Sequence, residues 1–132
     1  MPVSQEALEK IAAAYSAAWS SQDPAAVASF YAEDGQIQIN RGDILKGRAA
    51  IEEMAAGFYG EFPDLVVKCD LCRAAGDHAI FIWTLEGHHA ETRHFVRVGG
   101  WEEWDLTENG KVAASKGWFD AADYDRQVAN GL

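Results

Sequence analysis

Basic residues are scarce in this sequence. It holds 11 Lys and Arg against 21 Asp and Glu, which gives a formal net charge of −10 and a pI near 4.7. Nucleic acids and anionic lipid surfaces attract proteins mainly through Lys and Arg, so an acidic chain lacks the main source of that attraction. We therefore expect neither nucleic acid nor a membrane as a partner.

Long apolar runs are absent as well. No segment approaches the roughly 20 consecutive apolar residues of a membrane helix. The first residues, MPVSQEALEKIAAAY, have no basic region ahead of an apolar segment, which is the mark of a signal peptide. We expect a cytoplasmic protein. A length of 132 residues without repeats or linkers predicts a single domain over residues 1–132.

Cysteine is limited to Cys69 and Cys72, in the stretch CDLC. A zinc site needs a second pair of ligands, and a thioredoxin-like motif opens a helix. The surrounding LVVKCDLCRAAGDH alternates as a strand does, which predicts that residues three apart project to opposite faces. We interpret both cysteines as structural or incidental, and we expect no metal and no cofactor.

Helical periodicity marks the first half of the chain. Ser4 is a plausible N-cap for a helix whose apolar residues recur at helical spacing through Trp19. Asp23 as a cap and Pro24 in the first turn predict a second helix, which Gly35 would end. A short strand over 36–40 and a loop over 41–47 follow, and a third helix is expected from Arg48 to about Tyr59.

After Pro63 the apolar period changes from helical spacing to two. Four strands are predicted, and short stretches (AAGD, AET and ENG) connect them as antiparallel hairpins; they cover residues 65–74, 78–89, 93–107 and 111–119. A helical tail follows. Helices followed by a meander predict an α+β fold: a cone-like, curved, mostly antiparallel sheet around a cavity that the three N-terminal helices close. Such a cavity is a natural ligand site.

Several stretches share their order and spacing with a known family. They are the helix with Tyr15 and Trp19, then DPAAVASFYAEDGQI, LKGRAAIEEM and ENGKVAASKGWFDAADYDRQV. In these the chain resembles the SnoaL-like branch of the nuclear transport factor 2-like superfamily, named for polyketide cyclases, and it is distantly similar to ketosteroid isomerase. The resemblance implies isomerase, cyclase or dehydratase chemistry without a cofactor. The same fold also hosts binders with no activity.

The resemblance to ketosteroid isomerase also suggests roles for particular residues. Tyr15 falls on the oxyanion tyrosine and Glu102 on the oxyanion acid, a carboxyl group that an apolar site keeps neutral. Ile39 falls on the catalytic base, and an isoleucine cannot take a proton. Gly117 falls where cyclases and epoxide hydrolases carry an aspartate. The isomerase reaction in its known form is therefore not expected.

Strand alternation predicts which side chains face the cavity. Glu102 should face inward and Glu103 outward. Trp101 would lie on the outer face, which packs against a second copy in relatives, so we expect a homodimer through this convex face. We expect the substrate-binding residues to be Trp19, Phe58, Glu86, His94, Trp104, Ser115 and Phe119. The other polar and apolar residues predicted to face inward from the second strand are Ile80, Ile82, Thr84 and His88.

Three readings of the catalytic residues remain open. Glu102, with a pKa raised by burial, could act as an acid or base with Tyr15, or could only shape the cavity by hydrogen bonding. His88, oriented by Glu86, could form a catalytic pair or lie in solvent. Glu86, His88 and His94 also resemble a metal cluster.

Three functions follow from these readings. The leading hypothesis is an enzyme that uses Glu102 with Tyr15 or His88 for acid–base chemistry on a small, largely apolar carbonyl compound. The alternative is a binding or accessory domain without turnover. A protein-interaction module is a third possibility, which a cavity filled by side chains would favour.

Overall fold

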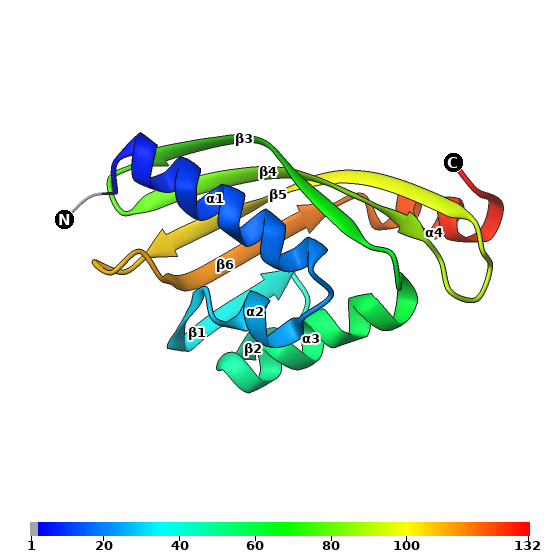
Figure 1. Ribbon diagram of the computed structural model, residues 1–132, viewed down its shortest axis with the longest axis horizontal. Coiled ribbons are helices and arrows are strands. Elements are labelled where there is room, and N and C mark those ends of the chain that lie inside the picture. The colour runs from blue at the N-terminus through cyan, green and yellow to red at the C-terminus, as the bar shows by residue number, and fades with distance from the viewer. Residues whose placement is uncertain (1–2) are drawn as a thin grey trace.

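The computed structural model describes residues 3–132 as one curved sheet partly wrapped by helices (Figure 1). The six strands lie in the order β2-β1-β6-β5-β4-β3. Every neighbouring pair is antiparallel except β1 with β6. This is the α+β, cone-like arrangement that the sequence predicted. The elements are α1 Gln5–Ser20, α2 Pro24–Ala28, β1 Tyr31–Ile39, β2 Ile44–Lys46, α3 Arg48–Glu61, β3 Val66–Ala75, β4 His78–His88, β5 Phe95–Leu106, β6 Val112–Phe119 and α4 Ala121–Asn130.

Helix α1 lies across the concave face of the sheet (Figure 1). The Ser4 hydroxyl caps it by accepting from the Ala7 N–H, as expected of an N-cap. Its apolar stripe, from Leu8 through Tyr15 to Trp19, is buried. Tyr15 meets the rings of Phe81 and Trp104 edge-on, at centroid distances of 5.4 and 5.2 Å. The core therefore lies between α1 and the middle strands.

The second helix is much shorter than predicted. It ends at Ala28, and Tyr31–Asp34, expected to be helical, belong to β1. The long-range pairing of Tyr31 with Val112 in the parallel β1–β6 ladder overrides the local helical pattern. Gly35 does not end a helix: it lies at a register shift in β1, where a Cβ would come within 2.9 Å of two carbonyl oxygens.

Strand β2 was predicted as loop. Its three residues pair with Gln36–Gln38 of β1. The connecting turn places Asn40 and Arg41 at φ values of 50° and 60°, and the Gly42 N–H donates to the Ile39 carbonyl. Two consecutive positive φ values are typical of a tight hairpin, which the sequence usually signals with Asn-Gly rather than Asn-Arg.

The prediction that Cys69 and Cys72 face opposite sides is wrong. Cys69 pairs with Trp83 and Cys72 with Phe81, and these two partners lie two residues apart on β4, on the same face. A bulge between Cys69 and Leu71 inserts an extra residue, so Cys69 and Cys72 project to the same face although they are three residues apart. Both thiols are free, and burial raises the pKa of Cys69 to about 11.

Helix α4 packs beside β5 through a buried glutamine. The Gln127 side chain accepts from the Arg97 N–H at 2.7 Å and donates to the Arg97 carbonyl at 3.0 Å. Its amide thus takes the place of a neighbouring strand's peptide group. None of the helices within residues 3–132 is long and apolar enough to span a membrane.

Candidate active site

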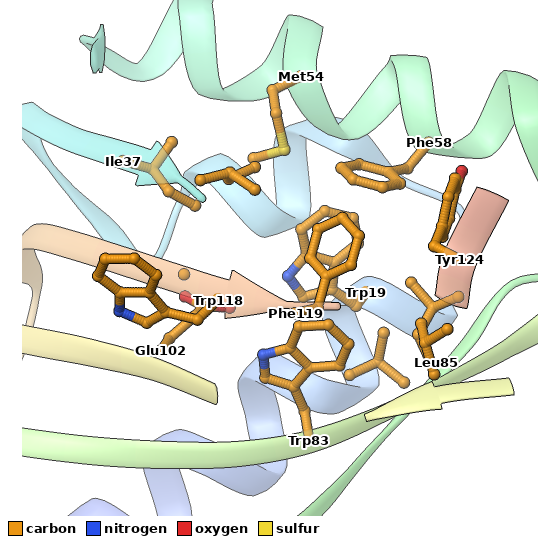
Figure 2. A pocket seen from close by; sticks show the side chains of 14 residues that line it. Trp19, Ile37, Met54, Phe58, Trp83, Leu85, Glu102, Trp118, Phe119 and Tyr124 are labelled. Carbon is orange, nitrogen blue, oxygen red and sulfur yellow. The ribbon is translucent and has the colours of Figure 1, made fainter. Parts of the chain in front are cut away.

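A pocket opens between α3, α4 and the concave side of the sheet (Figure 2). The cavity has a volume of about 60 Å³, which is room for a few water molecules. Its walls are almost entirely apolar and aromatic, and Glu102 is the carboxylic acid among them. The lining residues are Trp19, Ile37, Ile39, Met54, Phe58, Val67, Trp83, Leu85, Val98, Glu102, Gly117, Trp118, Phe119 and Tyr124.

Strand pairing explains why Glu102 faces this pocket. In the β4–β5 ladder, Phe81 lies opposite Glu102 and Leu85 opposite Val98, and directly opposed residues share a face. Glu102 is 7% exposed, whereas its neighbour Glu103 is exposed on the other side and accepts a hydrogen bond from the Trp118 indole. The predicted parity of β5 is confirmed.

The Glu102 carboxyl group is held by a buried hydrogen-bond network. Its Oε1 accepts from Ser115 Oγ at 2.8 Å, Trp104 Nε1 at 2.9 Å and the Tyr15 hydroxyl at 3.1 Å. The Tyr15 and Tyr31 hydroxyls lie 2.8 Å apart. Oε2 is more lightly bonded, at 3.4 Å from the Tyr15 hydroxyl. One oxygen is thus fixed in place, and the other is better able to exchange a proton with a ligand.

Burial and hydrogen bonding act in opposite directions on Glu102. Burial raises its pKa because the charged form loses hydration, and the donors Trp104, Ser115, Tyr15 and Tyr31 oppose this by stabilising the anion; burial prevails. The pKa values of Tyr15 and Tyr31 are also raised well above the ordinary value, first by burial and then by the Glu102 charge. Both phenols therefore remain neutral donors.

The raised pKa of Glu102 predicts a pH dependence of stability. Between the ordinary value of 4.5 and the raised value, the folded state binds more protons than the unfolded state, so the free energy of unfolding falls as pH rises. The contribution is complete below 4.5 and is lost above the folded pKa. We expect Glu102→Gln to gain stability relative to the wild type as pH increases through this window. Urea unfolding at a series of pH values measures the difference in unfolding free energy between the two proteins, with Glu103→Gln as the control. A difference that does not change with pH would contradict the raised pKa of Glu102.

The prediction that Glu86 and His88 line the cavity is wrong. Both lie on the outer face of β4, as do Ile80, Ile82 and Thr84. The Lys68 ammonium 2.8 Å from Glu86 lowers the pKa of that carboxyl group, and Arg97 adds to the effect. His88 is exposed, with its Nδ1 2.6 Å from Asp64. The predicted inward and outward faces of β4 were interchanged because this strand is apolar on both faces.

His94 also lies away from the pocket. Its ring Nδ1 is 2.8 Å from the Val128 carbonyl oxygen of α4. Glu86, His88 and His94 therefore engage different partners and do not converge as a metal site, and residues 3–132 contain no other cluster of three such ligands.

The other predicted residues divide into two groups. Trp19, Phe58 and Phe119 line the pocket. Tyr15, Trp104 and Ser115 instead contact Glu102 from the core and do not contribute to the pocket wall. Their effect on a ligand would pass through Glu102.

Sequence reasoning missed Trp83, Tyr124, Met54 and Tyr31 as parts of this site. Trp83 was missed because the parity of β4 was inverted. Tyr124 comes from the C-terminal helix, which was not expected to form a wall. Tyr31 was expected to lie in the second helix; its place beside Tyr15 depends on the parallel pairing of β1 and β6.

Comparison with known protein families identifies the family of this chain. The SnoaL-like domain matches residues 12–115. This chain belongs to the SnoaL-like family. No curated protein matches its sequence significantly. The two positions where the resemblance implied acids are apolar in this SnoaL-like chain: Ile39 and Gly117 pair across β1 and β6, and both line the pocket.

Solved structures share the fold at low sequence identity. A hypothetical protein with a ketosteroid isomerase-like fold from Catenulispora acidiphila, in complex with trimethylamine, has a TM-score of 0.84 and 21% identity over 91% of this chain and 92% of its own. SalBIII, an epoxide hydrolase/cyclase-like enzyme of pyran ring formation in salinomycin, has a TM-score of 0.79 and 18% identity over 90% of this chain and 95% of its own. A protein from a Jannaschia species, classed with SnoaL-like polyketide cyclases, has a TM-score of 0.85 and 15% identity over 100% of this chain and 97% of its own. At these identities the likeness shows the fold.

Proposed function

We propose that this SnoaL-like protein is a cofactor-independent acid–base catalyst that acts on a small, largely apolar carbonyl compound, in an isomerisation, cyclisation or dehydration. The observation that carries the proposal is one buried carboxyl group, Glu102, at the wall of an apolar aromatic pocket. A carboxylic acid with a raised pKa stays protonated closer to neutral pH than a solvated one, which suits a general acid.

The role of each group follows from the hydrogen bonds. Glu102 donates the proton on Oε2 to the carbonyl oxygen of the substrate. The carboxylate that results is stabilised at Oε1 by Ser115, Trp104 and Tyr15, whose donors are already in position. Tyr31 supports Tyr15 through the short contact between the two hydroxyls. His88 has no part, because it lies on the outer face.

Exchange of α hydrogens in a ketone tests this proposal without knowledge of the natural substrate. When Glu102 protonates the carbonyl oxygen, water removes an α hydrogen, and the C–H electrons form the C=C bond of the enol. On return to the ketone, the α carbon takes a deuteron from D₂O, and the enol O–H bond breaks as its proton goes back to the Glu102 carboxylate. We expect the protein to accelerate loss of the α-proton NMR signal of 1-tetralone, and tetralin, which has no carbonyl group, to inhibit competitively. Exchange at the buffer rate with 1-tetralone bound would contradict catalysis.

A non-catalytic binding or accessory domain is the second candidate. The apolar Ile39 and Gly117, at the positions where the resemblance implied acids, favour it, because they leave Glu102 without a second carboxyl group in the pocket wall. The trimethylamine complex of the Catenulispora protein is a precedent for a small molecule bound to this fold. Binding of 1-tetralone without exchange supports this candidate.

We also propose a homodimer through the outer face of the sheet. Trp101 is 41% exposed there and stacks on Trp118 at a centroid distance of 6.2 Å. Val66 and Leu71 on the same face are 39% and 40% exposed. Exposed apolar side chains gathered on one face favour a protein contact.

The dimer can be tested by one substitution. Trp101→Glu is expected to convert the dimer to a monomer, because it places a charge in the apolar patch, and light scattering after size exclusion measures the mass. Leu132→Glu, at a residue 62% exposed on the C-terminal segment, should leave the dimer intact. A wild-type protein that is monomeric at micromolar concentration would rule the dimer out.

Two further expectations remain proposals. Residues 1–132 are proposed to form one domain, supported by the single sheet that joins every strand within residues 3–132; one cooperative unfolding transition is the expected result. Cytoplasmic location is supported by the two free thiols on one face of β3, since reducing compartments keep such thiols unpaired. Recovery in the cytosolic fraction of the source cells tests it.

A further inference from the structure

The indole N–H of Trp83 is buried without a hydrogen-bond partner. Among the side-chain polar atoms of residues 3–132, it is the buried one that lacks a partner. Folded proteins satisfy the great majority of such groups, and an exception calls for a reason. Trp83 lines the pocket, which supplies one: the missing acceptor belongs to a ligand.

The packing of Trp83 fixes the direction of this N–H. Gly100 lies opposite Trp83 in the β4–β5 ladder, and the benzo edge of the indole occupies the space above it. A Cβ at position 100 would lie 2.5 Å from Cζ2 and 2.8 Å from Cη2 of the ring. Phe119 borders the indole at a centroid distance of 6.2 Å. In Figure 2 the nitrogen lies on the edge of the ring that is turned toward the Glu102 end of the pocket.

We propose that Trp83 is a specificity-determining residue that donates its indole N–H to an acceptor oxygen of the ligand. The inference rests on the proposed function, and it narrows the ligand to an apolar molecule with an accessible carbonyl or ether oxygen. Indole N–H is a donor only, so it matches neither a plain hydrocarbon nor an alkylammonium ion, which has no acceptor to offer. An aromatic pocket with an acid would otherwise suit such a cation.

Binding of 1-tetralone and tetralin, two molecules of the same shape, tests the inference. Hydrophobicity alone favours tetralin, whereas the Trp83 N–H favours the ketone. The decisive variant replaces Trp83 with 3-benzothienylalanine, which keeps the shape of the ring and substitutes sulfur for N–H. We expect this change to weaken 1-tetralone binding roughly five- to tenfold, the value of one neutral hydrogen bond, and to leave tetralin unchanged. The same replacement at Trp101, on the outer face, is the matched control and should affect neither.

A spectroscopic readout identifies the bond itself. The five tryptophans give five indole ¹H–¹⁵N signals, and the Trp83 signal is assigned by its absence in the variant. We expect 1-tetralone to shift this signal downfield and tetralin not to. The inference is overturned if the variant weakens both ligands equally, if it weakens neither, if the Trp83 signal does not respond, or if the wild type binds neither probe.

The outcome is separable from that of the proposed catalysis. Selective binding of 1-tetralone through Trp83 without α-hydrogen exchange would end the catalytic proposal and leave the role of Trp83 standing. Exchange that persists in the 3-benzothienylalanine variant with an unchanged KM would support Glu102 and remove Trp83 from ligand recognition.

Discussion

Glu102→Gln is expected to slow the α-hydrogen exchange of 1-tetralone by about 10²–10⁴-fold, the range that a single general acid contributes. The amide oxygen of glutamine can still accept from Ser115, Trp104 and Tyr15, so the fold and the pocket should be kept. An amide has no proton of comparable acidity to give to the carbonyl oxygen. NMR of the ketone in D₂O measures the rate, and the affinity of the variant for 1-tetralone should change little.

The matched control for this prediction is the next residue along the strand. Glu103→Gln makes the same chemical change on the outer face, where Glu103 bonds to Trp118, and it should leave the rate unaltered. The wild-type rate should also fall as pH rises through the raised pKa of Glu102, because only the protonated acid is active. Equal rates for the wild type and Glu102→Gln would exclude Glu102 as the acid.

Trp104→Ala is expected to lower the free energy of unfolding by about 3–5 kcal/mol, the usual cost of removing a large buried aromatic residue. Trp104 is 1% exposed, stacks on Phe81 at a centroid distance of 5.1 Å and donates to Glu102. Its loss leaves a cavity behind the acid. Urea unfolding measures the change, and a loss of this size is a large part of the stability of a typical domain.

Trp101→Ala tests whether the pleat of β5 accounts for that loss. The substitution is the same and the strand is the same, but Trp101 points outward and its main contact is the stack on Trp118. We expect a loss below about 1.5 kcal/mol, the value of one aromatic pair. Measurement at several protein concentrations separates any dimer contribution. Similar losses for the two variants would contradict the assignment of faces.

Much of the fold could be predicted because its signals are local. The apolar stripe that ends at Trp19 and the short turns between the four later strands are read directly from spacing, and they give α1 and the meander. Strand β1 was partly missed because its first residue, Tyr31, pairs with Val112, about 80 residues away along the chain. No local pattern carries that information.

The same distinction applies to the site. On β5, apolar residues alternate with Arg97, Glu103 and Asp105, so the inward position of Glu102 followed from the sequence. On β4, Ile80 and Ile82 are as apolar as Phe81 and Leu85, and alternation cannot tell the faces apart; Trp83 was lost for that reason. The bulge beside Cys69 likewise depends on backbone geometry that residue types do not specify.

The Gln127 side chain, bonded to both peptide groups of Arg97, has a practical consequence. It holds α4 in place, and α4 supplies Tyr124 to the pocket wall. A chain cut before Ala121 would keep every strand but lose the Tyr124 side of the pocket wall. Affinity tags and fusion partners are therefore better attached ahead of α1, where they leave this wall undisturbed.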